Sequence, residues 1–235
     1  MIEFKNLHKR FGKLTVLDGL DLTINKGGIF AVLGPNGSGK TTLIKCLLGM
    51  VIPNKGDIHF ENKSVLKKWD YRNELNYLPQ IANFPPNLSV IELIQMVKNL
   101  RPKESNEQEL IDLFGLNDSL NKKLGNLSGG TKQKVNLVLT FMFDSNLIIL
   151  DEPTTGLDPI SLIHLKGLIQ KEKAKGKTIL ITTHIMSFVN EMADEIVFLL
   201  DGKIYFKGSI DQLKKQTNND DLEHAIANLI SKQHA

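Results

Sequence analysis

A glycine-rich stretch from Gly34 to Thr41, GPNGSGKT, carries the clearest chemistry in the sequence. It fits the pattern G-x-x-x-x-G-K-[ST], and it follows an apolar run and precedes an apolar-periodic segment, the context of a phosphate-binding loop. Glycines let backbone N–H groups turn toward phosphate oxygens, and a helix N-terminus adds a favourable dipole. Lys40 is placed to reach the β- and γ-phosphates, and the Thr41 hydroxyl to bind Mg²⁺. We therefore predict that a nucleotide is bound by Gly34, Pro35, Asn36, Gly37, Ser38, Gly39, Lys40, Thr41 and Thr42.

Two adjacent carboxylates, Asp151 and Glu152, end a second apolar run, Leu147 to Leu150. In a parallel sheet such a strand brings Asp151 to the carboxyl edge beside the nucleotide, where it can hold the Mg²⁺ shell. Glu152, at the next position, points elsewhere and can accept a proton from an attacking water. The pair therefore predicts hydrolysis of the nucleotide rather than binding alone.

The stretch LSGGTKQKV, from Leu127 to Val135, looks like a second phosphate-binding loop. Ser128, Gly129 and Gly130 precede a segment of helical spacing with inward apolar residues, so the serine and the glycine amides form another dipolar anion site. On its own the signal is weak, because Ser-Gly-Gly is also a common loop. Two such loops in one chain need an explanation.

Hydrophobic spacing indicates the elements that position these residues. Apolar residues from Phe4 to Ile24, interrupted by Gly12 and Gly19, predict short antiparallel strands. Two strand-then-helix units follow, one from Ile29 to Gly49 and one from Leu147 to Thr182, and each is typical of a parallel sheet. Asp201-Gly202 predicts a closing hairpin. The fold class is therefore α/β, with a parallel-sheet core and an N-terminal antiparallel β piece.

A helical insertion from about residue 84 to residue 143 separates the two units. Its first helix is signalled by a capping box, Ser89 to Glu92, after the pair Pro85-Pro86. The tail from residue 217 to residue 235 is polar and then helical in pattern. We therefore expect one domain over residues 1–216, with the insertion as its helical subdomain, followed by a C-terminal helical tail.

Composition excludes several classes of protein. The net charge is only +3 and the lysines are scattered, so we expect no nucleic-acid partner. One cysteine, Cys46, cannot form a disulfide within the chain, and its apolar surroundings predict a small buried hydrophobe. No apolar run reaches the roughly 18 residues of a spanning helix, so work at a membrane would require spans from another chain.

Taken together, these motifs resemble the ABC (ATP-binding cassette) ATPases, whose members carry LSGGQ where this chain has LSGGT. The resemblance covers nearly the whole chain. It implies a P-loop NTPase (RecA-like) core, with ATP and Mg²⁺ as ligands. In that family the LSGGQ-type loop completes the site of a second cassette, so Ser128, Gly129 and Gly130 would serve a second copy in a head-to-tail dimer. The phosphate loop of a chain would then contribute to one ATP site of the dimer, and its LSGGT loop to the other.

The resemblance assigns further residues. Gln80 is similar to the Q-loop glutamine that touches Mg²⁺ or the attacking water, so the implied metal residues are Thr41, Gln80 and Asp151, and the implied catalytic residues are Glu152, His184 and Gln80. Asp158 resembles the D-loop aspartate at the dimer interface, and His184 the switch histidine at the γ-phosphate. Phe11 fits the aromatic that stacks on adenine, with Val16 near the ribose; the alternative for both is a place in the core.

Two positions depart from the family pattern. Thr131 stands where glutamine is usual, which puts one side-chain contact to the partner's nucleotide in doubt. The stacking aromatic is phenylalanine instead of the commoner tyrosine, which matters little because stacking uses the ring face. Neither departure argues against ATP hydrolysis.

The implied function is an ATPase that powers a membrane transporter, with a polytopic membrane subunit as partner, at the cytoplasmic face of the inner (plasma) membrane. The compact insertion and the segment from Leu222 to Leu229 resemble exporter-type cassettes of bacterial ABC-2 systems. LSGGTKQKV with Phe141 to Asp144 is similar, more narrowly, to the ATPase subunit in copper-site maturation of nitrous-oxide reductase. The alternative is a soluble ABC ATPase that serves cytosolic metal or iron–sulfur cluster assembly. A DNA-repair or translation cassette fits poorly, because there is one phosphate loop and no long insertion before the signature.

Overall fold

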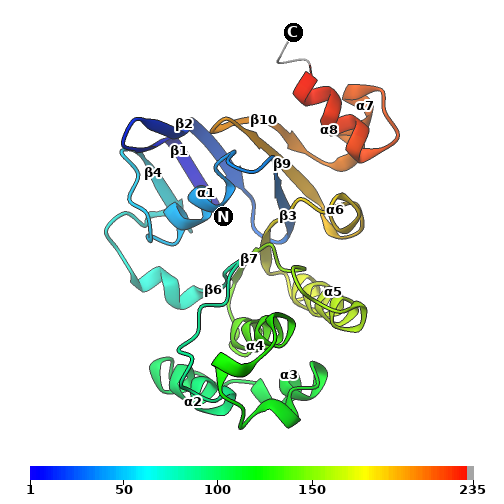
Figure 1. Cartoon of the computed structure of the whole chain (residues 1–235). Helices are drawn as coiled ribbons and strands as arrows, with labels where there is room; N and C mark the ends of the chain where they lie inside the picture. Colours follow the sequence, from blue (N-terminus) through cyan, green and yellow to red (C-terminus); the bar gives the residue numbers. More distant parts are fainter. Residues whose placement is uncertain (232–235) are drawn as a thin grey trace.

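The computed structural model describes residues 1–231 and contains two β-sheets (Figure 1). In the larger sheet, β9, β3, β8, β7 and β6 run parallel and β10 pairs antiparallel at one edge. In spatial order its strands are β10 (Lys203–Gly208), β9 (Glu195–Leu200), β3 (Gly28–Leu33), β8 (Thr178–Thr182), β7 (Leu147–Asp151) and β6 (Leu75–Leu78). The central strands are apolar and buried, as strands covered on both faces should be. The predicted parallel core and the closing hairpin at Asp201-Gly202 are confirmed.

The second sheet is antiparallel, which confirms the predicted N-terminal β piece. Its strands, in spatial order, are β2 (Leu14–Ile24), β1 (Ile2–Phe11), β4 (Lys55–Phe60) and β5 (Lys63–Ser64). The predicted break at Gly19 is wrong, because β2 continues through it. Gly19 instead adopts a positive φ of 65° where the register of β1 against β2 slips, so it takes up the extra residue of a bulge.

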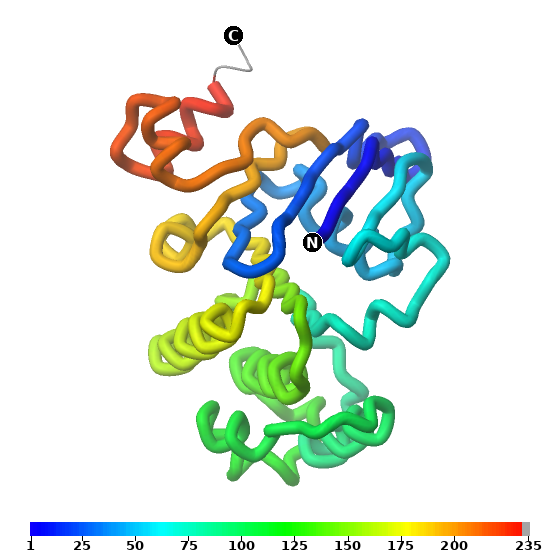
Figure 2. The backbone as a smooth tube through the Cα atoms, turned by 180° about the vertical axis from the view of Figure 1, so that it is seen from behind, coloured from blue at the N-terminus to red at the C-terminus, as the bar shows by residue number. Residues whose placement is uncertain are grey.

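Eight helices accompany the sheets within the described residues (Figures 1 and 2). Three of them, α2, α3 and α4, lie between β6 and β7 in the chain and gather at one end of the molecule, whereas α7 and α8 lie at the other. The helices are α1 (Lys40–Leu47), α2 (Val90–Leu100), α3 (Glu107–Leu113), α4 (Gly129–Phe141), α5 (Pro159–Ala174), α6 (Met186–Met192), α7 (Ile210–Thr217) and α8 (Leu222–Ser231). The capping box at Ser89 and Glu92 is present at the start of α2.

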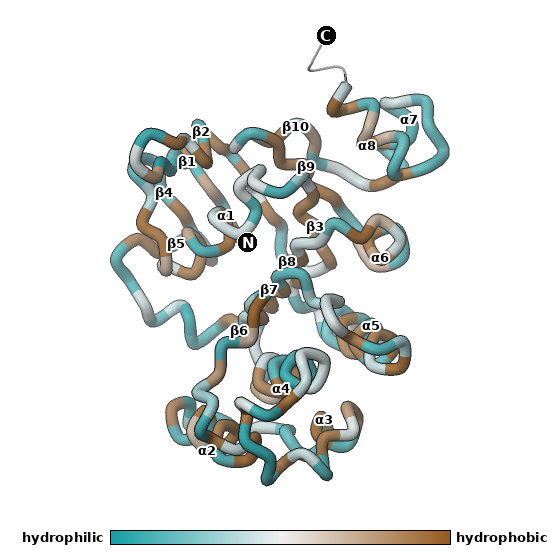
Figure 3. Tube along the Cα trace, in the orientation of Figure 1, coloured by the Kyte–Doolittle hydropathy of each residue, from teal (hydrophilic) through white to brown (hydrophobic). Residues whose placement is uncertain are grey.

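Burial of apolar side chains joins these elements. Figure 3 shows hydrophobic colour along β7 and hydrophilic colour in the loop between α7 and α8. One buried cluster joins α2, α3 and α4 to α5 and to one face of the large sheet.

Cys46 lies fully buried in a second cluster, where burial raises the pKa of its thiol to about 11, so it behaves as the predicted small hydrophobe. Over residues 1–231 no helix is long and apolar enough to cross a membrane.

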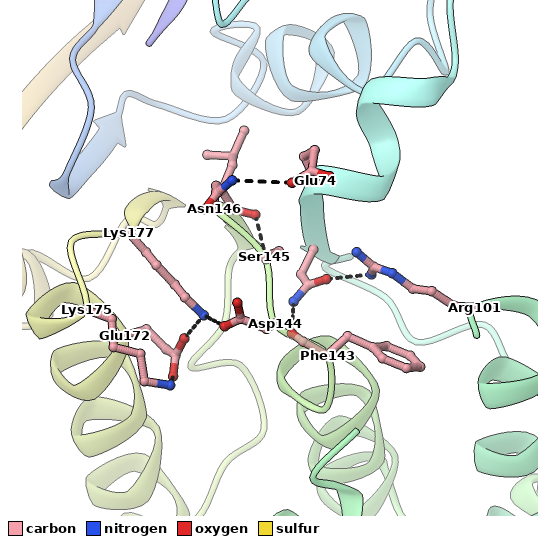
Figure 4. A network of polar contacts seen from close by, with 11 residues as sticks. Glu74, Arg101, Phe143, Asp144, Ser145, Asn146, Glu172, Lys175 and Lys177 are labelled. Atoms are coloured by element: carbon pink, nitrogen blue, oxygen red, sulfur yellow. Dashed lines mark hydrogen bonds and ion pairs between the residues drawn. The ribbon is translucent and has the colours of Figure 1, made fainter. Parts of the chain in front are cut away.

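An ion-pair network ties the C-terminal end of α5 to the chain just before β7 (Figure 4). Lys177 is paired with Glu172 and with Asp144; the Lys177 and Glu172 side chains are 8% and 11% exposed, whereas Asp144 is 83% exposed. Burial alone would lower the pKa of Lys177, but its hydrogen bonds to Asp144 and Glu172 hold that pKa above its ordinary value. The charged form of Lys177 is therefore part of the fold.

We expect Lys177→Met to lower the free energy of unfolding by about 3 kcal/mol, because Glu172 loses its buried partner. Lys175→Met is the matched control. Lys175 pairs with the same Glu172 at 2.7 Å but is 49% exposed, so the loss should stay below about 1 kcal/mol. Urea unfolding of both variants measures the difference. Equal losses would show that burial of the Lys177 pair contributes nothing.

Candidate nucleotide site

The phosphate loop connects β3 to α1 and holds its lysine inward. Gly34 has a φ of 153°, and a Cβ there would lie 2.0 Å from the carbonyl oxygen of Leu199, so only glycine fits. Lys40, 8% exposed, donates hydrogen bonds from Nζ to the carbonyls of Gly34, at 2.7 Å, and Pro35, at 3.0 Å. Burial lowers the pKa of Lys40, and the charges of Glu152 and Asp151 oppose that shift. The loop thus surrounds the ammonium group of Lys40, which can donate hydrogen bonds to phosphate oxygens.

A cleft of about 420 Å³ opens in front of this loop. It brings together residues from the β1–β2 hairpin, the phosphate loop, the end of β6 and the end of β7. Those lining it are Phe11, Leu14, Val16, Asn36, Gly37, Gly39, Lys40, Thr41, Thr42, Gln80, Asp151 and Glu152. Most of the predicted nucleotide and catalytic residues therefore share one cavity. Gly34, Pro35, Ser38 and His184 are predicted residues that do not line it. The Ser38 hydroxyl is buried without a partner among the described residues.

The hairpin side of the cleft is apolar and open. Phe11 is 48% exposed, so the core alternative is wrong for this residue, and Lys9 lies 4.7 Å from the centre of its ring. Val16 is half-buried. Leu14, 67% exposed, also lines the cleft and was not predicted from the sequence. An open aromatic face beside a phosphate loop suits a planar base.

Asp151 ends β7 at the bottom of the cleft, 1% exposed. One of its oxygens, Oδ1, accepts from the Thr182 hydroxyl, whereas Oδ2 is buried and has no partner in the described residues. Burial raises the pKa of Asp151, the hydrogen bond from Thr182 opposes the shift, and the charge of Glu152 adds to it. An unpartnered carboxylate oxygen beside a threonine hydroxyl is a fitting donor set for Mg²⁺, which prefers oxygen ligands.

Glu152 leaves the strand pattern at a left-handed φ of 50°, a strained conformation for a non-glycine residue. Its N–H donates to the Thr182 carbonyl at 2.9 Å, which fixes the backbone. The Glu152 carboxylate, 8% exposed, lies 3.0 Å from Nδ1 of His184, whose side chain is 67% exposed. His184 thus contacts the carboxylate directly, a contact that the sequence did not reveal.

The second glycine loop lies at the N-terminus of α4. Ser128 caps the helix by accepting from the Thr131 N–H at 3.2 Å, and its hydroxyl lies 2.8 Å from that of Thr131. The threonine that replaces the usual glutamine therefore pairs with Ser128. Among the residues that line the cleft, Ser128, Gly129 and Gly130 are absent. The loop therefore forms the N-terminus of α4 and lies outside the cleft.

The loop after β7 contacts the N-terminal part of α4. Asp158 caps α5 by accepting from Ser161, and it forms a 2.8 Å ion pair with Lys134 of α4. Hydrogen bonds from Lys134 and Ser161 hold the pKa of Asp158 well below its ordinary value. A Cβ on Gly130 would lie 2.8 Å from the Gly156 carbonyl oxygen. Asp158 therefore lies beside the Ser128 loop of its own chain, which the sequence did not predict.

Comparison with known proteins identifies close relatives of the chain. A family model described as ABC transporter matches residues 17–155. The chain is 35% identical to the lantibiotic transport ATP-binding protein SrtF of Streptococcus pyogenes, over 98% of this chain and 97% of the relative. It is 33% identical to the Nod factor export ATP-binding protein I of Burkholderia lata (88% and 70%). It is 31% identical to the L-cystine import ATP-binding protein TcyN of Bacillus subtilis (94% and 90%).

A solved structure described as the ATP-binding subunit of an ABC transporter has the same fold. It superposes with a TM-score of 0.90 at 28% identity, over 98% of this chain and 99% of that chain. The similarity in fold therefore extends over nearly the whole of both chains.

Proposed function

Because the chain belongs to the ABC transporter family of ATP-binding ATPases, we propose that it powers a membrane transporter by forming a head-to-tail dimer around two ATP molecules. One observation carries the proposal. The cleft holds a phosphate loop and two carboxylates, whereas the anion site at Ser128, Gly129 and Gly130 lies outside it. A second copy, turned head to tail, supplies to each cleft the anion site that it lacks.

Within the cleft each residue has a role that its position supports. Lys40 and the loop amides bind the β- and γ-phosphates, Phe11 stacks on adenine and Val16 lies beside the ribose. Thr41, Gln80 and Asp151 would hold Mg²⁺, which when bound neutralises charge on the phosphates. Glu152 accepts a proton from the attacking water. His184 orients the Glu152 carboxylate and faces the γ-phosphate, and Asp158 lies at the dimer interface.

A membrane partner would dock beside Gln80. The segment from Ile81 to Leu88 follows β6, and Ile81 is 70% exposed at the start of it. A polytopic membrane subunit bound here would hold the ATPase at the cytoplasmic face of the inner membrane. In this arrangement residues 1–216 act as one ATPase domain, with the helical subdomain at about 84–143, and the segment 217–235 is an added tail whose last four residues lie outside the described ones.

We further propose that the transporter is an exporter. The relative named for Nod factor export supports an exporter, as does the resemblance to ABC-2 cassettes, while the relative named for L-cystine import shows that the family works in both directions. The narrowest version is transport of a sulfur- or copper-related species for copper-site maturation of nitrous-oxide reductase, supported by LSGGTKQKV and by Phe141 to Asp144. The second candidate, a soluble ATPase of cytosolic metal or iron–sulfur cluster assembly, shares the same site.

The test is to purify the chain from its native membranes in mild detergent and to identify what accompanies it. We expect a polytopic membrane protein, and we expect Ile81→Asp to lose it because a charge replaces an apolar contact. Ile163→Asp, on the exposed face of α5 where Ile163 is 67% exposed, is the matched control and should keep the partner. A soluble scaffold in place of a membrane protein would favour the assembly ATPase.

A further inference from the structure

Helix α4 carries a buried polar stripe that none of the roles above uses. Gln133, Asn136 and Thr140 are 5%, 3% and 3% exposed, and their spacing of three and four residues places them on one face of the helix. Their neighbours Val135 and Leu137 are apolar and fully buried. Burying an amide costs free energy unless it is hydrogen-bonded, so the partners of the stripe are informative.

The two amides form one hydrogen-bonded bridge. Asn136 Nδ2 donates to the Pro79 carbonyl at 3.1 Å and to Gln133 Oε1 at 3.4 Å. Gln133 Nε2 in turn donates to the Pro153 carbonyl at 3.2 Å. The bridge therefore runs from the backbone after β6 to the backbone after β7 through two side chains of a single helix.

The two ends of this bridge lie next to the catalytic residues. Pro79 directly precedes Gln80, and Pro153 directly follows Glu152. At its other end α4 begins at the Ser128 loop, about 12 Å along the helix axis from Asn136. Helix α4 packs against β6, and it lies beside β6 and β7 in both views of the backbone (Figures 1 and 2). One rigid element thus connects the anion site for the second copy to both sides of the chain's own cleft.

We propose that Gln133 and Asn136 are positioning residues for ATP hydrolysis. They fix the separation of Gln80 and Glu152, and they transmit to both of them any movement of α4 that follows from nucleotide held at the Ser128 loop. The proposal rests on the roles given above to Gln80 and Glu152. If so, the rate of ATP hydrolysis in a chain's own cleft depends on its Ser128 loop, and the Gln133–Asn136 bridge within the same protomer provides the connection.

The test compares two buried asparagines. Asn136→Leu removes the bridge and keeps the branched outline of the side chain while adding bulk, which the control variant adds equally. The control, Asn76→Leu, acts on an asparagine that is 5% exposed and also donates to a backbone carbonyl, that of Phe143, at 2.7 Å. Asn76 accepts from Arg101, which lies near Phe143 (Figure 4). Asn76 is the second residue of β6, whereas Gln80 follows the other end of that strand. Both variants lose a buried amide contact, but only one of them touches the bridge.

We expect both variants to lower Tm by a similar amount, about 2–8 °C. Asn136→Leu should also lower kcat by about ten-fold or more with KM for ATP nearly unchanged, because misplaced catalytic groups slow the chemical step. Asn76→Leu should leave kcat within about two-fold. Equal kcat values for the two variants at equal loss of Tm would overturn the proposal, since the bridge would then be structural.

Two further measurements keep the proposal testable. In a Glu152→Gln background, Asn136→Leu should still form a dimer with ATP, because both phosphate sites are intact; loss of that dimer would mean that Asn136 acts on the Ser128 end instead. Gln133→Met breaks the bridge at its other amide, so it should lower kcat as Asn136→Leu does, and the double variant should lose no more than either single one. If Asn136→Leu fails to fold, Gln133→Met alone decides between these outcomes. Unchanged turnover of Gln80→Ala and Glu152→Gln would instead contradict the proposed function.

Discussion

Replacing Glu152 by glutamine should lower ATP turnover by about 10²–10⁴-fold while nucleotide binding persists. The amide is nearly isosteric with the carboxylate but cannot take a proton from water. The contact to His184 at 3.0 Å and the backbone held by Thr182 remain possible, so the cleft keeps its shape. Phosphate release at saturating ATP measures the loss, and size-exclusion chromatography with ATP and Mg²⁺ should show a stable dimer, because the complex forms and does not hydrolyse.

Glu191→Gln serves as the control for this experiment. Glu191 is an exposed carboxylate on α6 paired with Lys166, so its loss changes surface charge without touching the cleft, and turnover should stay at the wild-type value. Turnover of Glu152→Gln equal to that of the control would remove Glu152 as the base. Lost turnover without an ATP-dependent dimer would mean that the carboxylate is needed for binding or folding.

The parts of the site that were predictable from sequence are those whose chemistry is local. The loop at Gly34 must be glycine because of its own backbone, and β7 ends in two carboxylates that are adjacent in the chain. Apolar runs identified β7 and β8 as neighbours in a parallel sheet, and their register, Asp151 opposite Thr182, brings His184 to Glu152. The order of the strands predicted that His184 lies near Glu152, whereas it did not predict the hydrogen bond between them.

Other features had no local signature. Strand β6 was not predicted, because Leu75–Leu78 is short and contains Asn76, which looks unsuited to a buried strand until its partner at Phe143 is known. Helix α6, seven residues long, was also missed. Gln133 and Asn136 read as ordinary polar positions in a helix, since the residue type does not reveal that Pro79 and Pro153 accept their hydrogen bonds. Buried polar contacts between distant segments depend on tertiary structure.

The head-to-tail arrangement predicts that two inactive variants restore each other. Lys40→Met removes the cation of the phosphate loop. Ser128→Asp keeps a good N-cap residue on α4 but places a carboxylate in the anion site, where it repels the partner's nucleotide. Each variant alone should lose about 10²-fold or more in turnover, because a group that stabilises phosphate charge is lost from both sites of its dimer.

An equimolar mixture should regain about a quarter of wild-type turnover, because half of the dimers are mixed and each mixed dimer holds one intact site of two. That site joins the phosphate loop of the Ser128→Asp chain to the Ser128 loop of the Lys40→Met chain. Replacing the Ser128→Asp chain by the double variant Lys40→Met/Ser128→Asp is the control and should abolish the recovery. A mixture as inactive as its components would mean that each Ser128 loop serves its own cleft, which the position of Ser128, Gly129 and Gly130 outside that cleft argues against.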